Sequence, residues 1–292
     1  MRCGAAEERG TMECFPLFPG VALAYTEFRA ASCRMRSQAL PNVLEIAYCQ
    51  AGRFECAYKR DYVTYLGAGD FAVSVLSPEQ APPSFPLGYY DGVTLIVDRA
   101  QTGATFAGVV EDVAIDWMAL EEKFCCGRCC AVAPASPELR RVFEALWAVR
   151  EAPQRGYLRL KVLECFYLLT QMLPEVLPAA AYYSTQQIAK VKAVREALVA
   201  HPERREPLKV LAAHHGMSLT ALKECFKAVY GKPVAAFQRE YRMHLAAKWL
   251  CETTLSVAEI AGRLGYENPN KFSSAFKAVM GETPSVYRRA RR

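Results

Sequence analysis

One segment near the C-terminus of the chain occurs twice. Each copy combines an apolar pair, a glycine and a Phe-Lys-Ala-Val block, which lie at 211–212, 216 and 226–229 in the first copy and at 260–261, 265 and 276–279 in the second. The two glycines are 49 residues apart, and the two blocks are 50 residues apart. A repeat of this kind is one supersecondary unit used twice, so this part of the chain is expected to fold into two similar units.

Each copy has the pattern of a helix-turn-helix unit. A short apolar helix leads into a glycine turn, and a second helix with a single apolar stripe follows. In such units the second helix enters the major groove of DNA. The two copies therefore predict two recognition helices in one polypeptide.

The second helix of the first copy is expected to have one buried side and one exposed side. Ser218 follows the turn and is a good N-cap. Helical spacing predicts a buried stripe of Leu222, Cys225, Phe226 and Val229. The side chains that then project outward are Thr220, Lys223, Glu224 and Lys227.

The second copy repeats this division. Asn268 is the expected N-cap, and Pro269 occupies the first helical position, where its missing N–H costs nothing. Phe272, Phe276 and Val279 are expected to face inward. The outward side chains are Asn270, Lys271, Ser274 and Lys277. Small polar and basic side chains of this kind contact base edges and phosphates.

One amphipathic helix is expected between the copies, from Val234 to Cys251. At 1.5 Å per residue it would span roughly 27 Å. A helix of that length can hold two recognition helices about one DNA turn apart, on one face of the duplex.

Charge is divided unevenly along the chain. Residues 184–292 contain 19 Lys or Arg and 9 Asp or Glu, whereas residues 1–183 contain 17 basic and 21 acidic side chains. A basic C-terminal third joined to a mildly acidic remainder fits a domain that binds a polyanion. The terminal run 288–292 is either a mobile phosphate clamp or a solvated tail.

The spaced positions from 208 to 288 form a longer pattern. It consists of Leu211-Ala212, Gly216-Met217-Ser218, Leu222, Phe226-Lys227, Gly231, Arg242, Ala246, Leu250, Val257, Ile260-Ala261, Leu264-Gly265-Tyr266, Phe272-Ser273, Phe276-Lys277, Gly281, Thr283-Pro284-Ser285 and Tyr287-Arg288. This pattern resembles the AraC/XylS family of bacterial transcription regulators. The DNA-binding domain of that family carries two helix-turn-helix units joined by one long helix.

The resemblance implies roles for individual residues. Base contacts map onto Thr220, Lys223 and Glu224 in the first unit and onto Asn270, Lys271 and Ser274 in the second. Glu224 stands where many relatives carry a basic residue, and it either accepts from a cytosine amino group or orients Lys223 or Lys227. Arg242 serves either phosphate contact or domain architecture. Family precedent favours activation, with double-stranded DNA as partner and RNA polymerase as a second partner of an activator.

The N-terminal half carries a different pattern. Residues 43–98 contain short apolar runs, 43–49, 54–58, 62–66, 71–76 and 93–97, separated by turn residues such as Gly52 and 67–70. Many short strands with this spacing indicate a sandwich or barrel. The region resembles, more loosely, the cupin-like sensor domains of the same family, which implies a pocket for a small-molecule effector that the sequence does not identify.

The expected fold class is α+β, with a cupin-like β-barrel sensor, a helical linker and an all-α domain of two helix-turn-helix units. The expected boundaries are a flexible tail at 1–12, the sensor at 13–103, a helical linker or dimerisation region at 104–178, and the DNA-binding domain at 185–292. In the helical region a stripe repeats with helical spacing at Leu158, Val162, Cys165, Phe166 and Leu169. This stripe either forms a dimer face or covers the barrel.

One short segment of the chain is rich in cysteine. Cys125, Cys126, Cys129 and Cys130 lie within six residues and suggest an alternative, a thiol- or metal-responsive regulator. Closing a tetrahedral site normally needs a further ligand, so reduced thiols at a loop or helix end are the competing interpretation. No metal or cofactor is expected.

All four histidines lie at 201, 214, 215 and 244, so the expected barrel lacks the imidazoles of a metallo-cupin enzyme. The chain is therefore expected not to be an enzyme. Its N-terminus lacks the apolar core of a secretory signal, and no apolar run approaches the roughly 18 residues of a membrane helix. We expect a cytoplasmic protein.

Overall fold

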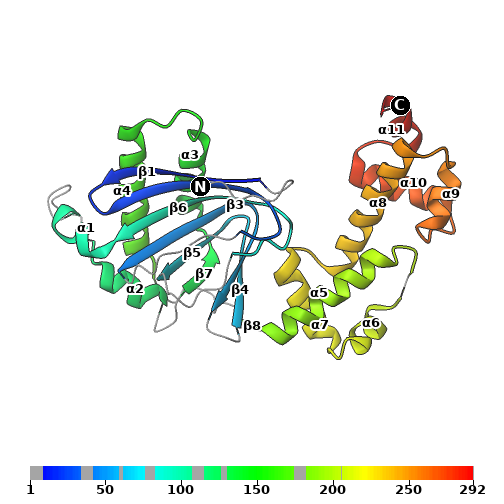
Figure 1. The fold of residues 1–292 in the computed structure, drawn as a ribbon, viewed down its shortest axis with the longest axis horizontal. Helices are drawn as coiled ribbons and strands as arrows, with labels where there is room; N and C mark the ends of the chain where they lie inside the picture. Colours follow the sequence, from blue (N-terminus) through cyan, green and yellow to red (C-terminus); the bar gives the residue numbers. More distant parts are fainter. Residues whose placement is uncertain are drawn as a thin grey trace. The chain divides into compact units, whose positions relative to one another are not determined.

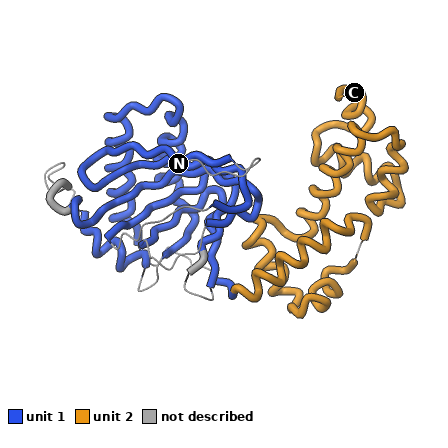
Figure 2. The backbone as a smooth tube through the Cα atoms, in the orientation of Figure 1, with its two compact units in different colours: residues 1–184 blue, residues 185–292 orange. Residues whose placement is uncertain are grey.

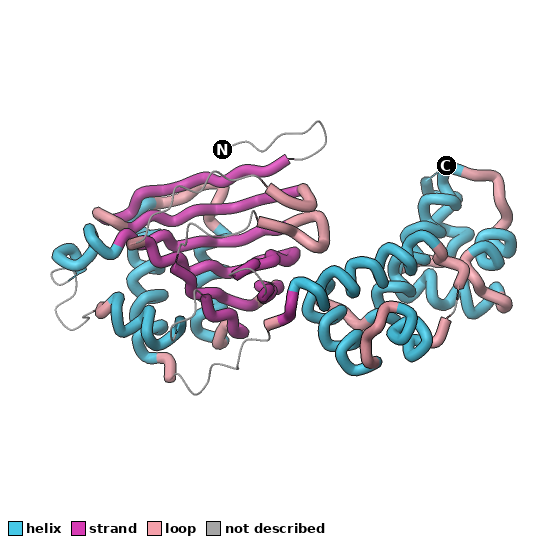
Figure 3. The backbone as a smooth tube through the Cα atoms, turned by 60° about the horizontal axis from the view of Figure 1, so that its bottom comes forward, coloured by secondary structure: helices cyan, strands magenta, loops and turns pink. Residues whose placement is uncertain are grey.

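The computed structural model describes residues 9–33, 42–58, 62–75, 83–106, 115–125, 130–173, 182–204 and 206–291. The chain divides into two compact units, residues 1–184 and residues 185–292 (Figure 2). The described strands belong to the first unit, and the described regular elements of the second unit are all helices, joined by loops (Figure 3).

The first unit is built on an antiparallel sheet. Its strands are β1 (Arg9–Phe18), β2 (Val21–Arg29), β3 (Val43–Tyr58), β4 (Tyr62–Gly67), β5 (Asp70–Val75), β6 (Tyr90–Asp98), β7 (Cys130–Pro134) and β8 (Tyr183–Ser184). They pair in the order β1-β2-β6-β3-β4-β8, and β5 joins β3 to β7. Residues 9–12, expected in a flexible tail, are part of β1, while residues 1–8 lie outside the described part.

Strand β3 differs from the prediction. Two strands separated by Gly52 were expected, but one strand of 16 residues runs through this glycine. Its first half pairs with β5 and β6, and its second half pairs with β4. The register shifts between Cys49 and Ala51, and Gly52 has a positive φ of 84°. A bulge lets a strand bend without ending, which is why the turn signal was misleading.

The expected closed barrel is not seen in the described residues. The path of paired strands runs from β1 at one edge to β8 at the other, and no described pairing joins these two edges. The structure therefore shows a sheet-rich unit, as predicted, without closure of the sheet.

Four helices accompany the sheet in the described part of this unit: α1 (Arg99–Phe106), α2 (Trp117–Cys125), α3 (Pro137–Ala148) and α4 (Arg155–Gln171). Helix α3 begins at Pro137 as predicted, and Ser136 caps it by accepting from the Leu139 N–H at 3.2 Å. Helices α2, α3 and α4 lie on one face of the sheet (Figure 1). We call this the covered face and its reverse the second face.

The apolar stripe of α4 packs on the covered face. Every member of the stripe is at most 1% exposed and belongs to one core with Leu44, Ile46 and Leu95 of the sheet. Of the two roles considered for the stripe, covering its own sheet is confirmed, and the dimer face is wrong. The period of the helix could not decide this, because both roles bury the same residues.

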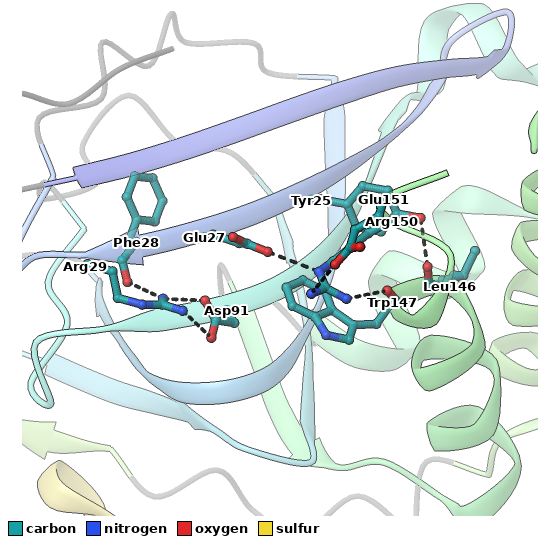
Figure 4. Close-up of polar contacts among 9 residues, drawn as sticks. All are labelled: Tyr25, Glu27, Phe28, Arg29, Asp91, Leu146, Trp147, Arg150 and Glu151. Atoms are coloured by element: carbon teal, nitrogen blue, oxygen red, sulfur yellow. Dashed lines mark hydrogen bonds and ion pairs between the residues drawn. The ribbon is translucent and has the colours of Figure 1, made fainter. Parts of the chain in front are cut away.

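Polar contacts fasten the end of α3 to strand β2 (Figure 4). The Tyr25 hydroxyl donates to the Leu146 carbonyl over 2.8 Å, and Arg150 Nε lies 3.2 Å from a Glu27 carboxylate oxygen. The Arg150 guanidinium also stacks over the Trp147 ring, 4.6 Å from its centroid. Burial raises the pKa of Tyr25 to about 12, so this donor keeps its proton across the physiological range.

The second face carries smaller side chains and is itself partly packed, since Ala24 and Ala72 are 0% and 4% exposed. One cross-strand row consists of Cys14, Ala24, Thr94, Ala47, Ala72 and Val132, from β1, β2, β6, β3, β5 and β7. The next row places Glu45 between Ile96 and Ser74. At one end of this face lies an aromatic cluster that includes Phe28, Phe54, Phe85 and Tyr90.

The second unit contains seven described helices: α5 (Thr185–Ala200), α6 (Leu208–His214), α7 (Leu219–Tyr230), α8 (Val234–Glu252), α9 (Val257–Arg263), α10 (Pro269–Met280) and α11 (Pro284–Arg291). Helices α5 and α7 pack on one end of α8, and α9, α10 and α11 pack on the other (Figure 1). Across both units, no described helix is long and apolar enough to cross a bilayer.

Charge placed within the α4 stripe should unfold the first unit. We expect Val162→Glu to lower the free energy of unfolding by more than about 4 kcal/mol, because an unpaired carboxylate would be buried in an apolar core. Leu160→Glu is the matched control, since Leu160 lies on the same helix and is 68% exposed. Chemical denaturation of the two variants tests this, and equal stability would contradict the packing described for α4.

Stability of the first unit should depend on the protonation of Glu45. Burial raises the pKa of Glu45 from 4.5 to about 7. The folded state therefore holds this proton more tightly, and the contribution to stability is lost as the pH rises from 4.5 through about 7. In the wild type the free energy of unfolding should fall by at most about 3 kcal/mol over that window. In the Glu45→Gln variant this fall should be absent. Urea denaturation between pH 5 and 8 measures it, and parallel curves for wild type and variant would refute it.

Candidate DNA-binding surface

The two predicted turns have the same backbone geometry. Gly216 and Gly265 both adopt positive φ, 61° and 74°. In each turn the residue after the glycine donates to the carbonyl of the second residue of the apolar pair, Met217 to Ala212 and Tyr266 to Ala261, both over 2.9 Å. The repeat in sequence is thus a repeat in hydrogen bonding, and each glycine supplies a left-handed conformation that other residues seldom adopt.

Both second helices begin at the predicted caps. The Ser218 hydroxyl accepts from the Ala221 N–H at 3.1 Å, and the Asn268 side-chain oxygen accepts from the Asn270 N–H at 2.8 Å. Left-handed glycines, Gly231 and Gly281, end the two helices. Helices α7 and α10 are therefore 12-residue segments with defined start and end points.

The predicted stripes are buried. Leu222, Cys225 and Phe226 of α7 are at most 1% exposed, as are Phe272 and Phe276 of α10. Val279 is only partly buried but packs against the core of the second copy. Burial raises the pKa of Cys225 to about 12, so this thiol is a packing group.

The predicted outward side chains are exposed on the opposite sides of α7 and α10. They are Thr220, Lys223, Glu224 and Lys227 on α7, and Asn270, Lys271, Ser274 and Lys277 on α10. No side-chain hydrogen bond or ion pair joins any of these eight to another described residue. Each helix therefore presents free donors and acceptors from a rigid backbone.

Glu224 was given two alternative roles. No ion pair links it to Lys223 or Lys227 in the described structure. Both roles, acceptance from a base and orientation of a neighbouring lysine, stay predictions.

Arg242 is not part of the exposed surface. It is 6% exposed on α8, and its Nε and Nη2 donate to the carbonyls of Pro202 and Arg204 over 2.5 and 2.7 Å. Of the two roles considered, the structure supports the architectural one, and the assignment of Arg242 to DNA contact is corrected. Sequence reasoning could not find its partners, which are backbone atoms 38 and 40 residues away.

The loop held by Arg242 also touches the second copy. A Cβ on Gly265 would lie 2.3 Å from the Glu203 carbonyl oxygen, so the turn of the second copy packs directly on the loop before α6. We call residues 202–204 the junction loop. It contacts α8 through Arg242 and the second turn through Glu203, and so it fixes one helix-turn-helix unit against the other.

Two further basic residues have structural partners. Arg288, considered part of a clamp or tail, donates through Nε to the Leu250 carbonyl at 3.2 Å and through Nη2 to the Leu255 carbonyl, which ties α11 to the end of α8. Lys190 of α5 donates to the Gly216 carbonyl at 2.9 Å and so supports the first turn. No sequence signal marked Lys190, because its partner is a main-chain atom.

The cysteine cluster is only partly described. Cys125 ends α2 and Cys130 begins β7, and both are buried, while residues 126–129 lie outside the described part. Within the described residues no group of histidine, cysteine and acidic side chains is placed to hold a metal ion.

Known proteins match the C-terminal region. The family model described as a helix-turn-helix domain matches residues 211–290. The transcriptional activator AarP of Providencia stuartii is 34% identical over 84 residues, which cover 29% of this chain and 62% of AarP. The chain carries an AraC-type helix-turn-helix domain.

Other relatives match the AraC-type domain over a similar length. The activator RhaR of Mannheimia succiniciproducens is 31% identical over 101 residues, which cover 35% of this chain and 37% of RhaR. The C-terminal domain of AraT, a response regulator from Geobacillus stearothermophilus, is 33% identical and matches with a TM-score of 0.34 over 35% of this chain and 85% of that domain. This chain spans less than two thirds of the length of AarP and of RhaR. Both are transcription activators, not enzymes.

Loss of Arg242 should destabilise the AraC-type domain. We expect Arg242→Ala to lower the free energy of unfolding by about 2–4 kcal/mol, because it removes two charge-assisted hydrogen bonds that join α8 to the junction loop. Arg239→Ala, at an exposed position on the same helix, is the control and should change little. Thermal denaturation provides the measurement. Equal stability of the two variants would contradict the architectural role of Arg242.

Proposed function

We propose that this chain is a sequence-specific DNA-binding transcription regulator, and more narrowly an effector-responsive activator. The observation that carries the proposal is the duplicated exposed surface of α7 and α10, held on one rigid helical unit. The AraC-type domain and the transcription activators that share it support DNA as the ligand of this surface. An activator would also contact RNA polymerase.

Each recognition helix is assigned one part of an operator. Thr220, Lys223 and Glu224 of α7 would contact bases of one half, and Asn270, Lys271 and Ser274 of α10 would contact bases of the other. Lys227 and Lys277 lie further along the same exposed sides and would contact phosphates. This assignment uses donors and acceptors that the protein itself leaves unpaired.

The first unit is assigned the sensing role. A cupin-like sensor remains the proposed relationship for its sheet, although the described strands do not close. A ligand bound there would regulate transcription only if it had different affinities for two arrangements of the chain. A homodimer is compatible with this scheme, and sedimentation of the intact protein would establish it.

Substitutions on the two helices should weaken different halves of one operator. We expect Thr220→Ala or Lys223→Ala to reduce protection of one half, and Asn270→Ala or Lys271→Ala to reduce protection of the other. Each lost base contact should cost about 1–3 kcal/mol of binding free energy. Footprinting with a selected binding sequence measures this, with Lys248→Ala of α8, an exposed lysine outside both recognition helices, as the control. Footprints unchanged by all four substitutions would overturn the assignment.

Affinity for DNA should also fall steeply as salt rises, because phosphate contacts release bound counterions. In a plot of the logarithm of the association constant against the logarithm of the salt concentration, the slope is negative. Each phosphate-contacting lysine removed, as in Lys227→Ala or Lys277→Ala, should make this slope shallower by about one. Titrations at several salt concentrations measure the slope. A flat dependence would argue against DNA as the ligand.

A further inference from the structure

Strand β1 forms one edge of the sheet in the first unit (Figure 1). It is ten residues long and pairs with β2 on one side, and no described strand pairs with its other side. An unpaired edge presents a row of N–H and C=O groups with which a further strand can form hydrogen bonds. The outer side of β1 is therefore a surface at which the sheet can be extended.

The strands at the other edges of the sheet are shorter. Strand β8 has two residues, and β7 has five and ends at Pro134. The Tyr182 hydroxyl also donates to the Cys130 carbonyl of β7 over 2.8 Å. Short edge strands with occupied main-chain groups resist pairing with another chain. Among the described edges, β1 is thus the one suited to a new strand.

The C-terminal end of β1 is closed to pairing. Pro16 has no N–H, and the register with β2 shifts between Pro16 and Phe18. Arg159 of α4 donates through Nε to the Leu17 carbonyl over 2.7 Å, and its guanidinium lies over the Phe18 ring. Residues 9–15 are what remains of the edge, and we call them the open run.

The open run carries two charged side chains of opposite sign. Arg9 and Glu13 lie four residues apart, and both are exposed. Neither forms an ion pair or a side-chain hydrogen bond with another described residue. A strand that pairs with the open run is therefore favoured if it places an acidic residue opposite Arg9 and a basic residue opposite Glu13.

A second copy of β1 supplies both charges. In an antiparallel pair about a two-fold axis perpendicular to the sheet, opposing residues lie on the same face of the sheet. With Thr11 on the axis, Arg9 of each copy lies opposite Glu13 of the other. An axis at Glu13 would set the two carboxylates against each other, and an axis at Met12 would place Glu13 opposite Thr11. The register with Thr11 on the axis is the one that pairs both charges.

We propose that two copies of this chain associate through β1, in an antiparallel pair with Thr11 on the two-fold axis and Arg9 opposite Glu13 at both ends. The inference goes beyond the proposed function, because it does not depend on DNA binding, and it gives a surface to the homodimer considered there. The paired segment runs from residue 9 to residue 13 in each copy. A contact of this size is small, so the dimer dissociates on dilution.

Sedimentation of the full-length protein without DNA tests the dimer. We expect a reversible equilibrium between monomer and dimer. Glu13→Arg sets two guanidinium groups against each other at both ends and should raise the dissociation constant about tenfold or more. Glu144→Arg, the same change at an exposed position of α3, is the matched control and should leave the constant unchanged. A protein that stays monomeric up to its solubility limit, or a dimer that Glu13→Arg does not weaken, would overturn the proposal.

A charge exchange separates pairing from folding. The double variant Arg9→Glu, Glu13→Arg restores opposite charges in the same register, so its dissociation constant should return close to that of wild type. Circular dichroism shows whether each variant is folded. A folded double variant that dimerises as weakly as Glu13→Arg alone would overturn the register.

Oxidative cross-linking tests the position of the axis. Cys14→Ser removes the exposed thiol of β1, and in that background Thr11→Cys puts two thiols directly opposite each other, within reach of a disulfide. The native Cys14 thiols would lie about 20 Å apart along the paired strands, because six residues separate them. We expect Thr11→Cys to add disulfide-linked dimers, whereas wild type and Cys14→Ser alone should not differ. Cross-linking that requires Cys14, or no gain with Thr11→Cys, would overturn the proposed axis.

Failure of this inference and failure of the proposed function give different results. Sedimentation and cross-linking contain no DNA, and footprinting reports on α7 and α10. A monomeric protein that protects an operator would overturn the β1 dimer and leave the proposed function in place. A dimer that responds to the β1 substitutions but protects no DNA would do the reverse.

Discussion

Burial of one apolar stripe on each recognition helix is the interaction on which the DNA-binding unit depends. With Phe226 and Phe276 fully buried, the helical period leaves the opposite sides of α7 and α10 exposed. The left-handed glycines at 216 and 265 then set the angle at which each helix leaves its turn. The buried stripes on one side of α7 and α10 consequently fix the positions of the exposed polar groups on the other side.

The two faces of the sheet in the first unit are packed differently. Helices α2, α3 and α4 seal the covered face, and the bulge in β3 lets that strand serve two sheet segments at once. Polar contacts such as Tyr25 to Leu146 fasten the covering helices (Figure 4). On the second face, burial raises the pKa of Glu45 to about 7, so ionisation of this carboxyl costs stability.

Local patterns in the sequence predicted the helical unit well. The caps at Ser218 and Asn268, the buried stripes and the exposed sides all depend on residues within four positions of one another, where spacing is informative. Contacts with distant backbone atoms were not predictable. For Arg242 the sequence left both phosphate contact and an architectural role open, because nothing near it in sequence marks the carbonyls of Pro202 and Arg204 as its partners.

The same limit applies to the sheet. Short apolar runs revealed that strands exist, but Gly52 appeared to be a turn because a bulge and a turn use the same residue. The α4 stripe had the period of any buried helix face, and only the three-dimensional structure shows that its own sheet covers it. Strands β1 and β2 carry weaker alternation and were found only in the structure.

The junction loop has a consequence for the DNA that this unit can recognise. Arg242 and Gly265 hold residues 202–204 from two sides, so neither recognition helix can swivel independently about α8. B-form DNA rotates by about 35° with each base pair, since one turn takes about 10 base pairs. Under the proposed function, a single inserted base pair between the two parts of an operator would therefore turn one of them away from its helix. Such a protein would respond to the helical phase of its operator as well as to the base sequence.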